Sequence, residues 1–238
     1  MLSKNEIKEI RALGQKKFRD ERGLFVVEGE KLVDEALHSG FDVVGLYRKE
    51  DIGEAAMGRI SQLTHPSPAL AVIRQPAPAM AAPTLSPDEL VLALDGIRDP
   101  GNLGTILRIA DWFGIRQVLA SEDTVELYNP KVVQSTMGAI FRVRVHYCNL
   151  AEVLMTGVVE PGMTVYGTFL EGESIYGTDL TRGGILVMGS EASGISPAVA
   201  ATVTQKLFIP PFPAGVRTSE SLNVAVATAI CCSEFRRR

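Results

Sequence analysis

Short apolar runs that alternate with helical patterns constrain the fold of this chain more than any other feature. Leu90–Leu94 and Gly184–Met188 are almost free of polar residues, which is typical of strands covered on both faces. A helical repeat follows the first run, with Ile106, Ala110 and Phe113 on one face. This alternation predicts an α/β fold with a mostly parallel sheet. The same pattern predicts strands at 117–120, 143–147, 164–169 and 206–209, and helices at 130–138, 150–156 and from 221 onwards.

A proline-rich stretch interrupts this pattern. Residues 76–87 contain four prolines and no charged residue, which is typical of a semi-rigid linker. The part before it predicts a small α/β domain, with a capping box of Ser3 and Glu6 opening its first helix. Its strands are expected at 25–28, 42–47 and 70–73, and its later helices at 30–39 and 52–63. We therefore expect an N-terminal domain over 1–75, a linker over 76–88 and a larger domain over 89–238.

The composition of the chain bears on its cellular location and on whether it holds a disulfide or a metal site. No run approaches the length of a membrane span, and the N-terminus lacks the apolar core of a signal peptide, so we expect a cytoplasmic protein. The three cysteines, Cys148, Cys231 and Cys232, suit neither a disulfide framework nor a zinc site. The three histidines are scattered as well. We expect no metal site.

The distribution of charge points to the N-terminus as a surface for nucleic acid. The chain carries a net charge of −4, which argues mildly against extensive phosphate binding. Residues 1–22 nevertheless hold seven Lys or Arg residues against four Asp or Glu residues, a local balance of +3. A solvated helix face would have a similar composition. The candidate nucleic-acid contacts in this stretch are Lys16, Lys17, Arg19 and Arg22.

Three polar stretches rich in small residues stand where an open parallel sheet places ligands, at the carboxyl ends of strands. They are Asn102–Arg108, Met188–Ile195 and the turn Ser219–Asn223 before the last helix. Each of them, taken alone, is explained equally well by a structural turn or a helix cap. No Gly-x-Gly-x-x-Gly follows Leu90–Leu94, and no Gly-Lys-Ser/Thr closes a phosphate loop, so a nicotinamide enzyme or an NTPase is disfavoured.

The three stretches in this order and spacing resemble the motifs of the SpoU/TrmH family of RNA 2′-O-ribose methyltransferases, of the α/β-knot (SPOUT) class. The resemblance spans about residues 90–236 and rests on Asp99–Arg108, on Val187–Glu191 with Gly194, and on Ile209-Pro210 leading to Ser221–Val224. It implies a C-terminal deep trefoil knot, S-adenosylmethionine as the cofactor, and a homodimer. Residues 3–75 are similar to the small RNA-substrate-binding domain that precedes the catalytic domain in several members.

The resemblance also assigns roles to single residues. Gly189, Ile209 and Leu222 align with cofactor-binding positions, and Gly167 ends a strand that adjoins the cofactor. The family's polar catalytic set corresponds to Asn102, Arg108, Glu191, Ser221 and Asn223. The link Pro211–Glu220 is several residues longer than is usual in the family, and Arg217 within it is a further candidate contact for the RNA.

The family interpretation makes Arg108 a base, but a guanidinium has a pKa above about 12 and stays charged. We instead expect Arg108 to clamp an RNA phosphate and to stabilise the developing alkoxide. The favoured function is S-adenosylmethionine-dependent methylation of a ribose 2′-hydroxyl in ribosomal RNA, because an extra N-terminal domain is present. Two alternatives remain: a tRNA 2′-O-methyltransferase, and a catalytically inactive RNA-binding or ribosome-assembly protein of the same fold.

Overall fold

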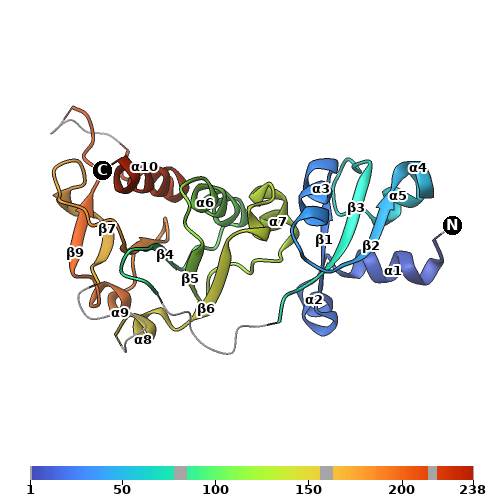
Figure 1. Ribbon diagram of the computed structural model, residues 1–238, viewed down its shortest axis with the longest axis horizontal. Helices are drawn as coiled ribbons and strands as arrows, with labels where there is room; N and C mark the ends of the chain where they lie inside the picture. The colour runs from blue at the N-terminus through green and yellow to red at the C-terminus, as the bar shows by residue number, and fades with distance from the viewer. Residues whose placement is uncertain (1, 78–84, 156–162, 214–218, 238) are drawn as a thin grey trace. The chain divides into compact units, whose positions relative to one another are not determined.

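The structure, a computed structural model, describes residues 2–77, 85–155, 163–213 and 219–237 (Figure 1). It separates into two compact units. The first unit combines residues 1–78 with residues 126–142, and the second combines residues 79–125 with residues 143–238. The sequence did not indicate that 126–142 belongs with the N-terminal unit. No helix in the described part of the chain is long and apolar enough to cross a membrane.

The first unit is built on a three-stranded antiparallel sheet with the order β1-β3-β2. One face of the sheet buries Val26 and Val72 against the helices α1 and α5, and the alternate residues face the other side. The predicted capping box of Ser3 and Glu6 opens α1. The elements are α1 (Lys4–Ala12), α2 (Lys16–Arg22), β1 (Leu24–Glu28), α3 (Glu30–His38), β2 (Val43–Arg48), α4 (Lys49–Ile52), α5 (Glu54–Ile60) and β3 (Ala69–Arg74).

The segment 126–142 completes the first unit with the helix α7 (Pro130–Thr136) and the 3₁₀ helix η1 (Ala139–Phe141). Two aromatic pairs join it to the rest of the unit. The ring centroids of Tyr128 and Phe25 lie 4.7 Å apart, and those of Phe141 and Phe41 lie 5.1 Å apart in an edge-on pair. Because such pairs contribute beyond the apolar area they bury, they help to hold the segment in this unit.

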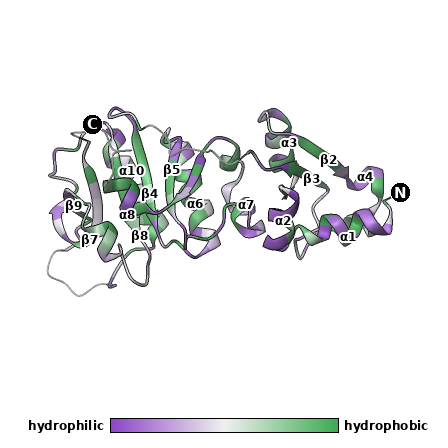
Figure 2. Ribbon diagram, turned by 90° about the horizontal axis from the view of Figure 1, so that it is seen from below, coloured by the Kyte–Doolittle hydropathy of each residue, from purple (hydrophilic) through white to green (hydrophobic). Residues whose placement is uncertain are grey.

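The second unit is a six-stranded, entirely parallel sheet with the order β6-β5-β4-β8-β7-β9, as the apolar runs predicted. Its strands are β4 (Leu90–Asp95), β5 (Gln117–Ser121), β6 (Arg144–Cys148), β7 (Val165–Ser174), β8 (Gly184–Gly189) and β9 (Gln205–Phe208). Its helices are α6 (Pro100–Trp112), α8 (Leu150–Met155), α9 (Pro197–Ala200) and α10 (Val224–Arg237). The central strand β4 is hydrophobic from Leu90 to Leu94, whereas α2 of the other unit is hydrophilic (Figure 2).

The end of the proline-rich stretch is part of the second unit's core. Leu85 is completely buried and packs with Val91, Ile185 and Val187. Most of the linker, residues 78–84, lies outside the described residues.

The starts of two helices beside the first and third motifs differ from the sequence prediction. Helix α6 begins at Pro100, well before the apolar repeat that starts at Ile106, because Asp99 caps it and Pro100 occupies its first turn. Helix α10 begins at Val224 rather than at Ser221. The two helices lie side by side and run in the same direction (Figure 1). At their carboxyl ends, Nε of Arg236 donates a hydrogen bond of 2.8 Å to the carbonyl of Phe113.

Candidate active site

The central strands bring the first two motifs together. At the carboxyl ends of β4 and β8, Asp95 pairs with Gly189 in the parallel register. The Asp95 carboxylate is buried, and its Oδ2 accepts a 2.6 Å hydrogen bond from the backbone N–H of Ser196. Asp95 therefore fixes the loop that follows β8 to the strand that precedes α6. The sequence analysis did not single out this residue, although an acidic residue that ends an apolar strand is a usable signal.

Asn102 is placed by the cap of α6. Oδ1 of Asp99 accepts the backbone N–H of Asn102 at 2.9 Å, so Asn102 stands in the first turn of the helix. The Asp-Pro pair in the sequence is a recognised helix-start signal and could have located this turn.

Glu191 connects all three motifs. Its Oε1 accepts hydrogen bonds from Nδ2 of Asn102 at 2.9 Å, from Nδ2 of Asn223 at 2.7 Å, and from the backbone N–H of Val224 at 3.4 Å. Nδ2 of Asn223 also donates to Oδ1 of Asn102 at 3.0 Å. Three residues separated widely in the sequence thus form one polar cluster, which we call the amide cluster: Asn102, Glu191 and Asn223.

Asn223 is also the cap of α10. Its Oδ1 accepts the backbone N–H groups of Ala225 at 3.0 Å and Val226 at 3.3 Å. The carboxamide therefore uses its oxygen on the helix and its nitrogen on Glu191 and Asn102. A helix cap was one explanation of the turn Ser219–Asn223, and the capping residue is Asn223, because α10 starts at Val224 rather than at Ser221.

Arg108 and Ser221 are not hydrogen-bonded to the amide cluster. Arg108 lies on α6 and is exposed, and its guanidinium makes no hydrogen bond or ion pair within the described ranges. Ser221 is exposed in the turn before α10. A guanidinium held on a rigid helix and without an internal anion is available to a phosphate.

Of the residues predicted to bind a cofactor, Gly189 ends β8, Ile209 follows β9 and Leu222 lies in the turn before α10. The family resemblance placed Gly167 at the end of a strand, but Gly167 is the third residue of β7, which continues to Ser174. A Cβ on Gly189 would stand 2.2 Å from the carbonyl carbon of Gly194, because the loop closes there through the hydrogen bonds between Ser190 and Gly194. A Cβ on Gly167 would stand 2.7 Å from the ring of Phe169. Ile209 is half-buried after β9, and Leu222 is 45% exposed. Close packing of the backbone thus requires a glycine at residue 189, whereas a side chain at residue 167 would displace the Phe169 ring. The two apolar residues leave surface for a ligand.

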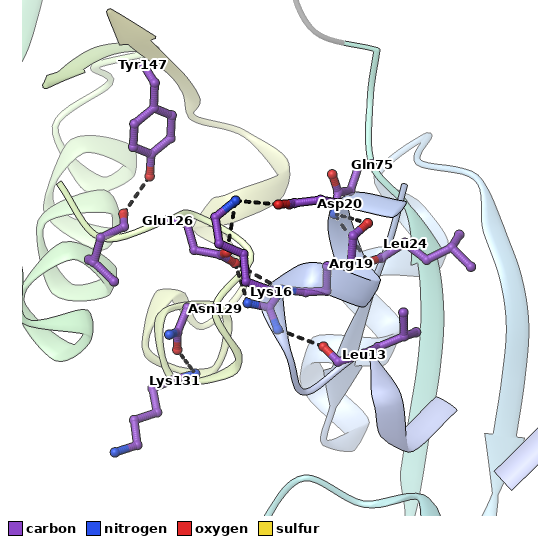
Figure 3. Close-up of polar contacts among 11 residues, drawn as sticks. Leu13, Lys16, Arg19, Asp20, Leu24, Gln75, Glu126, Asn129, Lys131 and Tyr147 are labelled. Atoms are coloured by element: carbon purple, nitrogen blue, oxygen red, sulfur yellow. Dashed lines mark hydrogen bonds and ion pairs between the residues drawn. The ribbon is translucent and has the colours of Figure 1, made fainter. Parts of the chain in front are cut away.

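Arg19 does not fit the predicted RNA contact. Its side chain is 3% exposed, and Nε and Nη2 donate to Oε1 of Glu126 at 3.0 and 2.6 Å (Figure 3). Its Nη1 donates to the carbonyl of Leu13 at 2.8 Å. A buried guanidinium that is already paired cannot reach a phosphate, so Arg19 is withdrawn from the candidate contacts and assigned to the fold of the first unit.

The other three candidates on α2 keep exposed charge. Nζ of Lys16 lies 2.5 Å from Oδ2 of Asp20, and Lys17 is exposed. Arg22 donates from Nη1 to the carbonyl of Glu9 at 3.2 Å and is half-buried. Arg217 lies outside the described residues.

Cys231 and Cys232 are buried on α10. Burial raises the pKa of Cys231 and of Cys232 to about 12, so both thiols stay protonated at neutral pH. Within the described ranges, no group of three His, Cys, Asp or Glu residues could hold a metal ion. The cluster at the site can orient and hydrogen-bond a ligand, and the exposed Arg108 can stabilise negative charge.

Two family profiles match the chain. The profile of the SpoU rRNA Methylase family matches residues 89–233, and that of the MRM3-like substrate binding domain matches residues 4–81. The second match ends within the proline-rich stretch, at residue 81, and the first begins just after it, at residue 89. All residues of the amide cluster lie within the first match.

Relatives match over the whole length. The chain is 30% identical to the 23S rRNA (guanosine(2553)-2′-O)-methyltransferase RlmP of Bacillus subtilis, covering 98% of this chain and 97% of the relative. A structure from Porphyromonas gingivalis assigned to the TrmH family of RNA methyltransferases is 42% identical, with a TM-score of 0.86 and coverage of 100% and 99%. An AdoMet-bound rRNA methyltransferase from Sinorhizobium meliloti is 29% identical, with a TM-score of 0.86 and coverage of 100% and 96%.

Proposed function

The chain belongs to the SpoU rRNA methylase family, and on that premise we propose that it transfers a methyl group from S-adenosylmethionine to a ribose 2′-hydroxyl of ribosomal RNA. The observation that carries the proposal is the amide cluster, in which Glu191 joins Asn102 and Asn223 at the carboxyl ends of the central strands. The full-length relative from Bacillus subtilis makes large-subunit ribosomal RNA the first substrate to test.

The loops after β7, β8 and β9 fit S-adenosylmethionine. An adenosine group needs apolar contact and a few backbone hydrogen bonds, and these loops offer the half-buried Ile209, the exposed Leu222 and the tightly folded backbone at Gly189. Gly167 lies on the adjoining strand β7. These residues would hold the cofactor, which supplies an electrophilic methyl group when it is bound.

The amide cluster would position the acceptor ribose. A 2′-hydroxyl must approach the methyl group in line, and correct placement alone is worth roughly 7–11 kcal/mol of the barrier. Glu191 holds the amides of Asn102 and Asn223, so that these two residues keep a fixed orientation for hydrogen bonds to the sugar. Ser221, exposed beside the helix start, would bind a neighbouring phosphate.

Arg108 would neutralise charge at the reacting oxygen. The 2′-oxygen becomes negative as its proton leaves, and a guanidinium stabilises such charge without giving up its own protons. Arg108 would at the same time clamp an RNA phosphate, to which its free N–H groups can bind as a fork. The proton of the 2′-hydroxyl passes to water or to a phosphate oxygen.

We propose that residues 1–75 recognise the RNA and that residues 89–238 form the catalytic domain with a C-terminal trefoil knot. The exposed Lys16 and Lys17 and the half-buried Arg22 are the remaining candidate contacts on α2. Because the 2′-hydroxyl distinguishes RNA from DNA, a substrate domain attached to this chemistry serves RNA. A tRNA substrate remains the alternative, and the N-terminal domain favours ribosomal RNA. We propose the cytoplasm as the compartment, because a ribosomal RNA substrate would be found there.

We also propose that the enzyme works as a homodimer through the outer faces of α6 and α10. Trp112 on α6 is 85% exposed and Val226 on α10 is 50% exposed. A large aromatic side chain left almost fully exposed on a rigid helix is typical of an interface anchor. A second copy is the occupant that the family implies.

The decisive experiment measures transfer of labelled methyl from S-adenosylmethionine to ribosomal and transfer RNA. Arg108→Ala should lower the rate about 10²–10³-fold, as loss of an oxyanion-stabilising group does, and Arg108→Lys should lower it less. Arg116→Ala is the matched control, because Arg116 is also exposed in the same unit, and it should keep full activity. Full activity of Arg108→Ala would contradict the role of Arg108. Cofactor binding without methylation of either RNA pool would contradict the proposed function.

A further inference from the structure

The first unit contains a hollow of about 130 Å³ between α1 and the sheet. Its floor is apolar and its rim carries four polar side chains, two of them acidic. The floor and walls consist of Ile10, Leu13, Leu24, Val44, Gly45 and Val72, and the rim consists of Glu6, Glu9, Arg22 and Tyr47. We call this feature the α1 hollow.

Gly45 shapes one wall of the α1 hollow. A Cβ at this position would lie 2.9 Å from Oη and 3.0 Å from Cε2 of Tyr47, so the phenol ring lies directly over the glycine. The ring can take this position only because residue 45 has no side chain. The α1 hollow is therefore bounded by the edge of an aromatic ring on one side and by a helix on the other.

The rim offers both hydrogen-bond acceptors and donors. One carboxylate oxygen of Glu6 accepts the N–H of Ser3, and one of Glu9 accepts Nδ2 of Asn5. The second oxygen of each carboxylate has no hydrogen bond within the described ranges. Arg22 uses only Nη1, on the carbonyl of Glu9, and the hydroxyl of Tyr47 makes no hydrogen bond in the same described part.

Tyr47 stays a donor across the working pH range. Burial, and then the negative charge of Glu6, raise the pKa of the Tyr47 phenol above its usual value. The neutral hydroxyl can donate one hydrogen bond and accept another.

The charges and hydrogen-bonding groups at the rim limit which ligands can bind in the α1 hollow. The two carboxylates repel a phosphate, and the Arg22 guanidinium weakens their attraction for a cationic side chain. A nucleobase satisfies the whole rim, because it is planar and apolar on its faces and carries donors and acceptors on its edges. We propose that the α1 hollow binds an unpaired purine base of the RNA substrate, guanine by preference. This inference rests on the proposed function, which makes RNA the substrate.

Guanine fits the rim better than the other bases. Its N1–H and N2–H groups are adjacent donors that match the free carboxylate oxygens of Glu9 and Glu6. Its O6 and N7 are acceptors for Arg22 or for the Tyr47 hydroxyl. Uracil presents one N–H between two carbonyls, so it would place acceptors against a carboxylate. Base recognition in single-stranded RNA uses edges and stacking in this manner.

Cations stand beside the same rim. Cζ of Arg22 lies 5.9 Å from the centroid of the Phe18 ring, and Nζ of Lys17 lies 5.9 Å from it. These cations can neutralise the phosphates that flank an inserted base, because each phosphate of an RNA strand carries one negative charge. Two of the candidate contacts predicted from the sequence, Lys17 and Arg22, would therefore both bind phosphates beside the inserted base.

The test titrates the full chain, saturated with S-adenosylhomocysteine, with guanosine 5′-monophosphate and with uridine 5′-monophosphate. NMR signals of the Leu24, Val44 and Val72 methyl groups report occupation of the α1 hollow. The guanosine nucleotide should shift these signals and bind about tenfold more tightly than the uridine nucleotide. Glu9→Gln should weaken guanosine binding about tenfold, whereas Glu21→Gln, an exposed control on α2 outside the α1 hollow, should not change it.

Equal binding of the two nucleotides, or unchanged binding by Glu9→Gln, would overturn the inference. Shifts produced by free arginine but not by guanosine would overturn it in favour of a protein partner. The outcome is separable from the proposed function, because the titration requires no methyl transfer. If the wild type methylates ribosomal RNA and Glu9→Gln does so with unchanged KM, the α1 hollow is not a base site and the enzyme's function stands.

Discussion

The carboxylates of Glu126 and Glu191, one in each compact unit, differ in the charge of their hydrogen-bond donors and in their exposure to solvent. Oε1 of Glu126 receives two N–H groups of the buried Arg19, and its Oε2 is buried with no hydrogen-bond partner among the described residues. The nearest other cation, Nζ of Lys16, is 3.9 Å from Oε2. Glu191 is exposed and receives three N–H groups, none of which is charged.

The difference separates a carboxylate that builds the fold from one that serves a site. A buried ion pair is costly to break, because the remaining partner is left as an unpaired charge away from water. An exposed carboxylate that accepts neutral N–H groups keeps its contact with water, so its desolvation penalty is small. It still fixes the direction of the N–H donors. Loss of the first should therefore change stability, and loss of the second should change activity.

The largest expected effect is on the ion pair of the first unit. Arg19→Met should lower the free energy of unfolding by about 3 kcal/mol, because it leaves the half-buried Glu126 carboxylate without the guanidinium that donates to it. Urea unfolding followed by circular dichroism measures the change. The matched control is Lys17→Met, an exposed residue on the same helix, which should change stability by less than about 0.5 kcal/mol.

The double variant sharpens this test. Arg19→Met with Glu126→Leu removes both charges, so it should recover most of the stability lost by Arg19→Met alone. A single variant that loses less than about 1 kcal/mol would show that the ion pair does not build the fold.

An intermediate effect is expected at the amide cluster. Glu191→Gln should reduce methyl transfer about 10–100-fold, since a neutral amide oxygen accepts more weakly and the new N–H₂ group would oppose the donors of Asn102 and Asn223. The free energy of unfolding should change by less than about 1 kcal/mol, because Glu191 is exposed. Single-turnover kinetics and urea unfolding on the same sample separate the two quantities, with the exposed Glu122→Gln as control. A loss of stability without loss of activity would reverse the comparison.

The smallest effect is expected at an exposed carboxylate that pairs with a cation. The hydroxyl of Ser121, and then Arg98, lower the pKa of Asp123 below its ordinary value of 3.8. Because the folded pKa is depressed, its stabilisation is present above the unfolded value and is lost as pH falls through the folded value. Asp123→Asn should therefore cost less than about 1 kcal/mol at pH 7, since the pair is exposed.

Urea unfolding of wild type and Asp123→Asn at a series of pH values tests the direction. The two proteins should converge in stability as the pH falls below about 3.8. A difference that grows with acidity would contradict the lowered pKa of Asp123.

Local patterns in the sequence predicted much of the fold for a physical reason. Apolar periodicity and capping residues act over a few positions, so the parallel strands and the Ser3–Glu6 capping box could be predicted. Because ligands bind at the carboxyl ends of parallel strands, the sequence also predicted that the three motifs lie close together. Helix starts were less accurate, because Asp99 and Asn223 extend or shorten a helix by hydrogen bonds that apolar periodicity does not record.

The sequence by itself therefore determined most of the strands and longer helices, the parallel direction of the strands in the large unit and the residue types at the site. The tertiary structure decided which charges are buried and which remain available. Arg19 and Arg22 both lie on α2. Because residues 126–142 pack in the same unit, Glu126 pairs with Arg19, whereas Arg22 lies at the rim of the α1 hollow. Burial and pairing depend on contacts between distant segments, and short-range patterns carry no information about them.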